Sequence, residues 1–409
     1  MSPSAARALG ARVPVTKHPS FIADPILGRR PRPNYNSHDH RGFRNPIALD
    51  QADVVCLGDS QTYGQGVACE DAWPTLLSST ISQSVYNMAF GGWGPTHSEA
   101  LLEEVLKLKP QLVIAGLYSG NDFHDCYSMV YSHKQSPQHR TNDRSLAAQM
   151  TELDRSQPIS SRQLLKEIKQ LANYRSGFIP DARLSLLGWN LIDLRAGLSN
   201  HSRLYGLARG IKNALPSNSS GNGTHSLTTE DLWQTWRRKA AKSGGRWEIC
   251  EEGNVRTVLT PHYRFQGLNM EDPRIQEGYR IAMAATIAMQ HKLTTSEAVF
   301  LVVLIPTKIL VFEPLVRSAS SSFSKLVEHE LRVWEATKNH LRENNIPYVD
   351  VLPALRKCLQ KGQQPYPIGV DGHPNPQGHK VIAASVSRWI EENLDLSLND
   401  HSQATAVMR

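Results

Sequence analysis

The stretch Asp53-Val-Val-Cys-Leu-Gly-Asp-Ser60 is the part of the sequence that best indicates the fold. Its apolar run is short, has no alternation with polar residues, and ends in a glycine followed by polar side chains. Runs of this kind are typical of strands that are buried on both faces of a parallel sheet and lead into a helix. The sequence therefore predicts a parallel strand over 53–57, with Ser60 at its carboxyl end.

The same pattern recurs along the chain. Four further strands are predicted, over 85–89, 112–117, 299–304 and 348–351. The segments between them have helical periodicity, which predicts helices over 73–82, 96–107, 275–293, 323–342 and 378–394. Strands that alternate with helices predict an α/β protein, here a flavodoxin-like three-layer α/β/α fold around a five-stranded parallel sheet.

Two changes of composition divide the chain. The first 50 residues are rich in Pro, Arg and Asn, and the alternation of strands and helices is lost between about 126 and 272. We expect a mostly helical insertion in this second region. The predicted organisation is an extended N-terminal arm (1–50), a core in two halves (51–125 and 273–395), the basic helical insertion (126–272) and a flexible tail (396–409).

The composition of the 409 residues is that of an ordinary globular protein. Hydrophobic residues make up 40% and charged residues 20%, which excludes whole-chain disorder and fibrous repeats. No apolar stretch approaches the length of a transmembrane helix, and no secretory signal is visible. We therefore expect a cytoplasmic protein, or a periplasmic or secreted one if a leader has been removed. The five cysteines are scattered without CxxC spacing, so neither a metal site nor a disulfide framework is predicted, and no cofactor is expected.

The net charge of +7 is concentrated in the insertion. Between 131 and 250 there are 18 Lys and Arg residues against 9 Asp and Glu residues, a surplus of 18 − 9 = 9. This surplus indicates either a solvated helical surface or a surface for an acidic partner. Because no nucleic-acid-binding module accompanies it, no nucleic-acid partner is expected. Trp233, Trp236 and Trp247 lie in or near the same region, either as stacking surfaces for sugar rings or as the core of a helical unit.

Polar residues follow most of the predicted strands. They form four blocks, at 58–62, 91–94, 119–122 and 371–375. In open parallel sheets, ligands bind beyond the carboxyl ends of the strands. We therefore expect the four blocks, although far apart in the sequence, to meet at one rim of the sheet.

The residues in these blocks have the chemistry that ester hydrolysis requires. A serine hydroxyl becomes a good nucleophile when a base removes its proton, and His373 is the candidate base for Ser60. Asp371 is the candidate carboxylate that orients the imidazole and stabilises its cation. The candidate oxyanion donors are the backbone N–H groups of Ser60 and Gly92 and the side-chain amide of Asn121.

Other residues near the blocks are candidates for contacts with the substrate. His124 and Asp125 follow the third block, and Lys308 follows the predicted strand over 299–304. Gly91 directly precedes Gly92, so the sequence leaves open which of the two glycines donates to the oxyanion.

In these motifs the chain resembles the SGNH, or GDSL-type, hydrolase superfamily. The first block reads Leu57-Gly-Asp-Ser-Gln-Thr-Tyr-Gly64, the third contains Gly120-Asn-Asp122, and the last reads Asp371-Gly-His-Pro-Asn375. The order Ser, Gly, Asn, His is the order of the family. Gln61 replaces the leucine of the familiar motif. The Asp-Gly-His spacing is one residue shorter than the familiar Asp-x-x-His and resembles an acetyltransferase-like branch.

The resemblance implies a serine-dependent ester hydrolase that forms an acyl-enzyme from a small-molecule, carbohydrate or lipid ester. An O-acyltransferase that modifies a polysaccharide uses the same catalytic residues and is an alternative. A further alternative is a non-catalytic protein that binds a polyanion through the basic insertion. The four complete blocks argue against this last alternative, because the loss of any one of them would end catalysis.

Overall fold

The computed structural model describes residues 20–159, 229–317 and 320–394. At its centre is a five-stranded sheet with the strand order β4-β3-β5-β8-β9, in which every pair is parallel. The strands are β3 (Val54–Leu57), β4 (Val85–Asn87), β5 (Leu112–Tyr118), β8 (Val299–Ile305) and β9 (Tyr348–Asp350). All five lie where the apolar runs predicted them, so the predicted α/β fold is confirmed.

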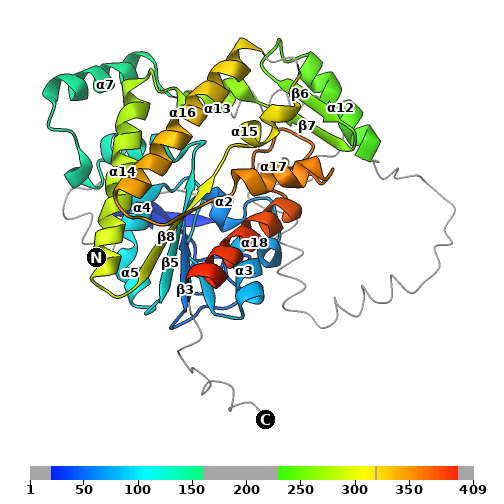
Figure 1. Ribbon diagram of the computed structural model, residues 1–409. Helices are drawn as coiled ribbons and strands as arrows, with labels where there is room; N and C mark the ends of the chain where they lie inside the picture. Colours follow the sequence, from blue (N-terminus) through cyan, green and yellow to red (C-terminus); the bar gives the residue numbers. More distant parts are fainter. Residues whose placement is uncertain (1–19, 160–228, 318–319, 395–409) are drawn as a thin grey trace, which may run out of the picture.

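Helices cover both faces of the sheet (Figure 1). On one side α3 (Trp73–Ile81) packs against α18 (Pro376–Asn393), and on the other α14 (Pro273–Thr294) packs against α4 (Pro95–Ala100) and α6 (Asp122–Tyr127). Helices connect consecutive parallel strands because a tight hairpin turn cannot join them. The single helix predicted over 96–107 is divided into α4 and α5 (Leu102–Leu106).

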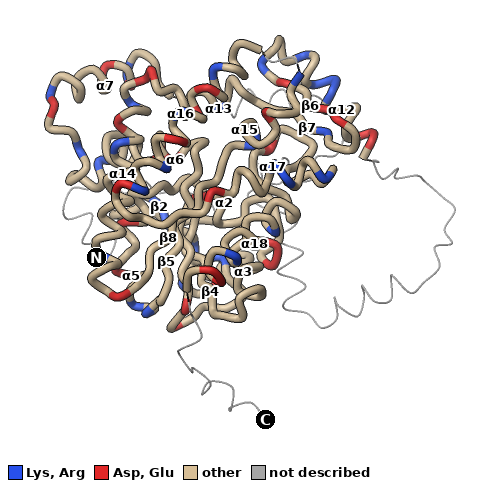
Figure 2. The backbone as a smooth tube through the Cα atoms, in the orientation of Figure 1, with Lys and Arg blue, Asp and Glu red and all other residues tan. Residues whose placement is uncertain are grey.

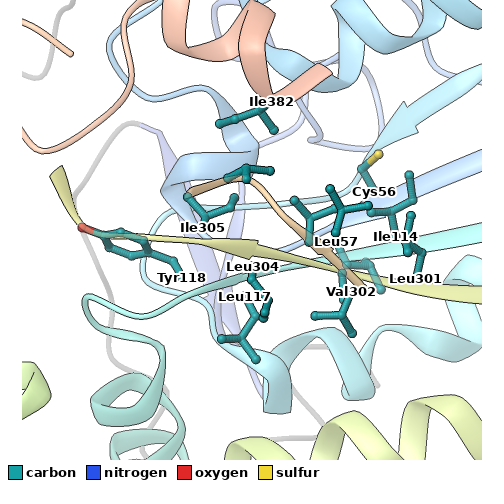
Figure 3. Close-up of a cluster of buried hydrophobic side chains, with 14 of the residues drawn as sticks. Cys56, Leu57, Ile114, Leu117, Tyr118, Leu301, Val302, Leu304, Ile305 and Ile382 are labelled. Carbon is teal, nitrogen blue, oxygen red and sulfur yellow. The ribbon is translucent and has the colours of Figure 1, made fainter. Parts of the chain in front are cut away.

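The strands of the sheet are buried on both faces, as their uninterrupted apolar sequences predicted. Every residue of β3 and β5 is buried, and so are six of the seven residues of β8. Figure 3 shows this cluster, with Ile382 of α18 packed against the sheet. The burial of apolar surface is the main favourable contribution to folding. The resulting core fixes the strand ends, which carry the polar blocks.

The N-terminal arm, which was expected to be extended, contains a β-hairpin. The strands β1 (Phe21–Asp24) and β2 (Gly28–Pro31) pair in antiparallel fashion. The Arg30 guanidinium binds the carboxylates of Asp24 and Glu104, which joins the hairpin to α5. Residues 1–19 of the predicted arm and the predicted tail lie outside the described residues.

The described parts of the insertion combine helices with a second hairpin. The helices are α7 (Arg144–Ser156), α12 (Thr229–Ala241) and α13 (Pro261–Leu268). In addition, β6 (Glu248–Glu252) and β7 (Val255–Leu259) form an antiparallel pair. The sequence did not indicate this pair, because the three glutamates of β6 weaken the apolar pattern of a strand. The segment 160–228, which contains much of the basic surplus, lies outside the described residues.

The three tryptophans of this region form a small core. Trp233, Trp236 and Trp247 pack with Ala240 and Val258 in a cluster of their own. All three are at most 8% exposed. They therefore stabilise the unit of α12 and the β6–β7 hairpin, and their faces are not available for stacking on a sugar.

Basic and acidic residues are interspersed along the described parts of the chain (Figure 2). No helix in the described ranges combines the length and the apolar character that are needed to cross a bilayer. The five cysteines are buried and form no disulfide.

Candidate active site

The polar blocks meet at the carboxyl ends of the parallel strands. Ser60 begins the short helix α2 (Ser60–Tyr63) directly after β3. The second block lies beside it, since a Cβ added at Gly91 would be 3.7 Å from the Cβ of Ser60. His373, which is 313 positions further along the chain, places its Nε2 atom 2.9 Å from the Ser60 Oγ atom. The sheet thus brings together residues that the sequence places far apart.

Ser60, His373 and Asp371 form a continuous hydrogen-bonded chain. The ring Nδ1 of His373 lies 2.6 Å from Asp371 Oδ1, and the same oxygen accepts the backbone N–H of His373 at 3.0 Å. The short Asp-Gly-His spacing therefore suits the contact, because the carboxylate closes a turn onto the backbone two residues later and also reaches the ring. An imidazole held in this way has Nδ1 protonated and Nε2 free to accept a proton from the serine.

The electrostatics of the site keep Asp371 ionised. Burial would raise its pKa, but the charge of His373 and the two hydrogen bonds from that residue lower the pKa well below its ordinary value. The side chains of His373 and Asp371 are 21% and 49% exposed, respectively. A small substrate can therefore reach the pair from solvent.

Asp59 supports the helix that carries the nucleophile. Its Oδ1 atom accepts the backbone N–H of Gln61 at 2.8 Å and caps α2, while its Oδ2 atom lies 3.3 Å from Ser60 Oγ. The side chain is buried, and burial raises its pKa to about 6. These contacts position the N-terminus of α2 and, with it, Ser60.

The raised pKa of Asp59 predicts a pH dependence of stability. The folded state binds this proton more tightly than the unfolded state, whose pKa is near 3.8. The contribution of Asp59 to stability is therefore fully present below about pH 4 and is lost as the pH rises through about 6. An Asp59→Asn variant keeps an oxygen for the cap but does not titrate. We expect thermal unfolding between pH 4 and pH 7 to show a smaller loss of stability in the variant than in the wild type, and an unchanged loss would contradict the assignment.

The candidate oxyanion donors come from three loops. Asn121 follows β5, and its amide donates one hydrogen bond to Asp125 Oδ2 at 2.5 Å, which leaves its second N–H for a ligand. The backbone N–H groups of Ser60 and Gly92 have no hydrogen-bond acceptor in the part of the chain that the structure describes. Gly92 has φ +74°, a left-handed backbone conformation that favours glycine at this position.

Asp125 and His124, which were expected to contact the substrate, lie next to this amide. Asp125 is an acceptor for Asn121, and the Nδ1 atom of His124 lies 3.8 Å from the second oxygen of the same carboxylate. Burial would raise the pKa of Asp125, but the interactions with His124 and Asn121 outweigh it and lower the pKa. The ionised carboxylate therefore fixes the orientation of the Asn121 amide.

An Asn121→Ala variant is expected to lower kcat by about 10²–10³, because the oxyanion would lose one donor aimed at it. KM for p-nitrophenyl acetate should change much less, since the donor acts mainly on the transition state. Steady-state kinetics check this expectation. A change of kcat below about threefold, which is far less than one lost donor costs, would remove Asn121 from the oxyanion site.

Lys308 is buried next to the loop that carries Asp371, and its ammonium is bound to backbone carbonyls of that loop. It is 4% exposed at the start of α15 (Lys308–Phe312), which follows β8. Its Nζ atom donates to the carbonyl oxygens of Pro367 (2.9 Å), Gly369 (2.6 Å) and Asp371 (3.1 Å). Lys308 was expected to contact the substrate, but all three N–H groups of its ammonium donate to these backbone carbonyls. Lys308 instead joins the end of β8 to the loop that carries Asp371.

Burial lowers the pKa of Lys308 to about 7, although the nearby Asp371 carboxylate acts in the opposite direction. A Lys308→Met variant keeps the length of the side chain but leaves three carbonyl oxygens without their common donor. We expect kcat to fall by about tenfold to a hundredfold with little change in KM, and unfolding to be easier by about 1–3 kcal/mol. Lys380→Met, an exposed change on α18, is the matched control. Equal kinetics for the two variants would contradict the positioning role.

Two arginines of the N-terminal arm, which were not among the predicted site residues, support the site. Arg44 donates to the carbonyl oxygens of Gly64 and Val67, both at 2.6 Å, and so holds the segment that follows α2. Arg29 donates to the carbonyl oxygen of Gly91 at 2.8 Å. Carbonyl acceptors leave no pattern in a sequence, so the sequence did not indicate these contacts.

No protein-family model matches the chain, and no curated protein matches its sequence. Similar solved structures include a lipolytic protein of the G-D-S-L family from Veillonella parvula, at 11% identity over 82% of this chain and 96% of that chain, with a TM-score of 0.34. A catalytic mutant of an acetylxylan esterase from Geobacillus stearothermophilus is similar at 10% identity over 85% of this chain and 97% of that chain, with a TM-score of 0.35.

These likenesses are distant, and the comparison with the predicted fold rests on the structure of the chain itself. A five-stranded parallel sheet carries the Ser, Gly, Asn and His blocks, in that order along the chain, at the carboxyl ends of its strands. This is the arrangement that the resemblance to SGNH-type hydrolases implied. The resemblance is therefore confirmed at the level of the fold.

Proposed function

We propose that the protein is a serine-dependent ester hydrolase that acts through an acyl-enzyme. The observation that carries this proposal is the chain of contacts from Ser60 Oγ to His373 (2.9 Å) and from His373 to Asp371 (2.6 Å). Both distances are within the reach of a hydrogen bond, which is the requirement for a base that activates a nucleophile.

In the acylation step, Ser60 Oγ attacks the carbonyl carbon of the ester while its proton moves to His373 Nε2. The carbonyl oxygen becomes an oxyanion, which the N–H groups of Ser60, Gly92 and Asn121 stabilise. The imidazolium is stabilised by Asp371. When the carbon–oxygen bond of the ester breaks, His373 returns the proton to the leaving alcohol, and the acyl group remains on the serine.

In the deacylation step, water takes the place of the alcohol. His373 removes a proton from the water, the resulting oxyanion is bound by the same donors, and its collapse releases the acid and restores the Ser60 hydroxyl. A sugar hydroxyl in place of water would turn the same steps into acyl transfer. The exposure of His373 and Asp371 favours hydrolysis, because water then reaches the acyl-enzyme without a second binding site.

Pre-steady-state kinetics with p-nitrophenyl acetate test the proposal. If deacylation is slower than acylation, an acyl-enzyme predicts a rapid burst of nitrophenol equal to the concentration of enzyme, followed by slower turnover. A panel of p-nitrophenyl esters of longer acids then defines the acyl group, and added sugars test for transfer by a faster release of nitrophenol. An enzyme that shows neither burst nor turnover with any ester of the panel would contradict the proposal.

A further inference from the structure

Arg264 differs from the other buried and half-buried arginines in the acceptors that its guanidinium N–H groups find within the described residues. Every other buried or half-buried arginine in the described ranges donates to a carboxylate, a hydroxyl or a carbonyl oxygen. Arg264 is half-buried, and within the same ranges its guanidinium makes neither a hydrogen bond nor an ion pair. A guanidinium has five N–H donors and is always charged, so donors left unused at a protected position are available to a ligand.

Arg264 lies on α13, which contacts two of the blocks that build the active site. At one point of α13, a Cβ added at Gly267 would be 2.7 Å from the carbonyl oxygen of Gly120, next to Asn121. The Arg264 side chain of the same helix contacts a second block, since a Cβ added at Gly372 would be 2.8 Å from Arg264 Nη2. Because Gly372 separates Asp371 from His373 in the sequence, the guanidinium lies against the loop that carries the base.

The surroundings of Arg264 hold the guanidinium between two aromatic rings, and the charges of Asp371 and Asp59 act on it without a direct hydrogen bond. Its central carbon lies 5.5 Å from the centre of the Tyr118 ring and 5.0 Å from that of Tyr263, distances at which a cation is attracted by an aromatic face. The Arg264 side chain also lines a pocket, together with Thr260, Lys308 and Gly372. Of these lining residues, Lys308 is also cationic, and it uses its donors on backbone carbonyls. Of the two cations that line this pocket, Arg264 is therefore the one whose N–H donors have no acceptor within the described residues.

We propose that Arg264 binds an anionic group of the substrate, a carboxylate or a phosphate, that is carried by the same molecule as the ester. This inference rests on the proposed function and specifies its substrate class. The planar guanidinium presents paired N–H groups that match two oxygens of such an anion. Its contact with the loop of His373 places the bound anion next to the reacting ester, so the protein selects acidic esters over neutral ones.

The test uses three aryl acetates that differ in the charge of the group para to the ester. These are methyl 4-acetoxybenzoate, which is neutral, 4-acetoxybenzoate, which carries a carboxylate, and 4-acetoxyphenyl phosphate, which carries a phosphate. We expect the wild-type kcat/KM to be at least about tenfold higher for one of the charged esters than for the neutral ester, which corresponds to one charge-assisted contact. The ester that is preferred identifies the anionic group.

An Arg264→Gln variant should lose this preference through a rise in KM of about tenfold for the charged ester. Its kinetics with the neutral ester should stay within about twofold of wild type, since no reacting atom is touched. Arg332→Gln, a change of an exposed arginine on α16 (Ser321–Glu343), is the matched control and should alter none of the three rates.

The outcomes separate the two proposals. Equal rates of the wild type for all three esters would overturn the role of Arg264 and leave the esterase function intact. An equal loss of activity of Arg264→Gln on neutral and charged esters would also overturn it, because this result indicates a positioning residue. No hydrolysis of any ester by the wild type, including the neutral one, would instead contradict the proposed function itself.

Discussion

The variants Ser60→Ala and His373→Ala are each expected to lower kcat for p-nitrophenyl acetate by roughly 10⁶-fold. Without the Ser60 hydroxyl no acyl-enzyme forms, and without His373 the hydroxyl keeps its proton. Because the two residues act as one unit, the double variant should be no slower than either single variant. The measurement is the steady-state rate of each variant against the rate of the ester in buffer.

Circular dichroism and thermal unfolding serve as controls for the fold in these variants. Ser60 is half-buried and His373 is 21% exposed, so removal of either side chain should leave the sheet intact. Losses that multiply in the double variant would show that the two residues act independently. That result would contradict the hydrogen-bonded chain on which the mechanism depends.

The second large effect is expected for Asp371→Asn, with a loss of about 10⁴-fold in kcat. An asparagine amide that donates to His373 Nδ1 would favour the wrong tautomer, with the proton on Nε2, and Nε2 could then not accept the proton of Ser60. The loss is smaller than for His373→Ala because the base is still present and can adopt the correct tautomer for part of the time.

Steady-state kinetics test this expectation by a comparison of Asp371→Asn with His373→Ala. The control is Asp50→Asn, a change of an exposed aspartate. The Asp50 variant should behave as wild type. The expected loss leaves Asp371→Asn with only a small fraction of the wild-type kcat. If the variant retained more than about a tenth of the wild-type kcat, the orientation of His373 would have to depend on another group. Loss of folding in the variant would show that Asp371 also stabilises its loop.

The strands of the sheet could be predicted because each strand is marked by its own short segment of sequence. Each strand is a short apolar run between polar turns, and burial on both faces makes the run continuous. The positions of the strand ends then follow, and with them the place of Ser60 directly after β3, where its Oγ atom lies 2.9 Å from His373 Nε2. The β6–β7 hairpin was missed for the opposite reason, since the glutamates of β6 conceal the apolar alternation of a strand.

The parts of the site that could not be predicted depend on tertiary contacts with backbone groups. Lys308 was expected to face the substrate, but its three acceptors are carbonyl oxygens of a loop about 60 residues away. Arg29 and Arg44 likewise bind carbonyls of distant segments. Every residue has a carbonyl, so no residue type or spacing marks such contacts. The sequence did not indicate Arg264, because its distinguishing feature is the absence of hydrogen-bond and ion-pair partners within the described residues.

Activity-based labelling tests the central claim most directly. Wild-type protein is incubated with a fluorophosphonate, digested, and examined by mass spectrometry to locate the modified residue. The account predicts a stoichiometric adduct on Ser60 that is absent in Ser60→Ala and much slower to form in His373→Ala. An unlabelled wild-type protein, or an adduct on a serine outside the 58–62 block, would contradict the assignment of Ser60 as an activated nucleophile.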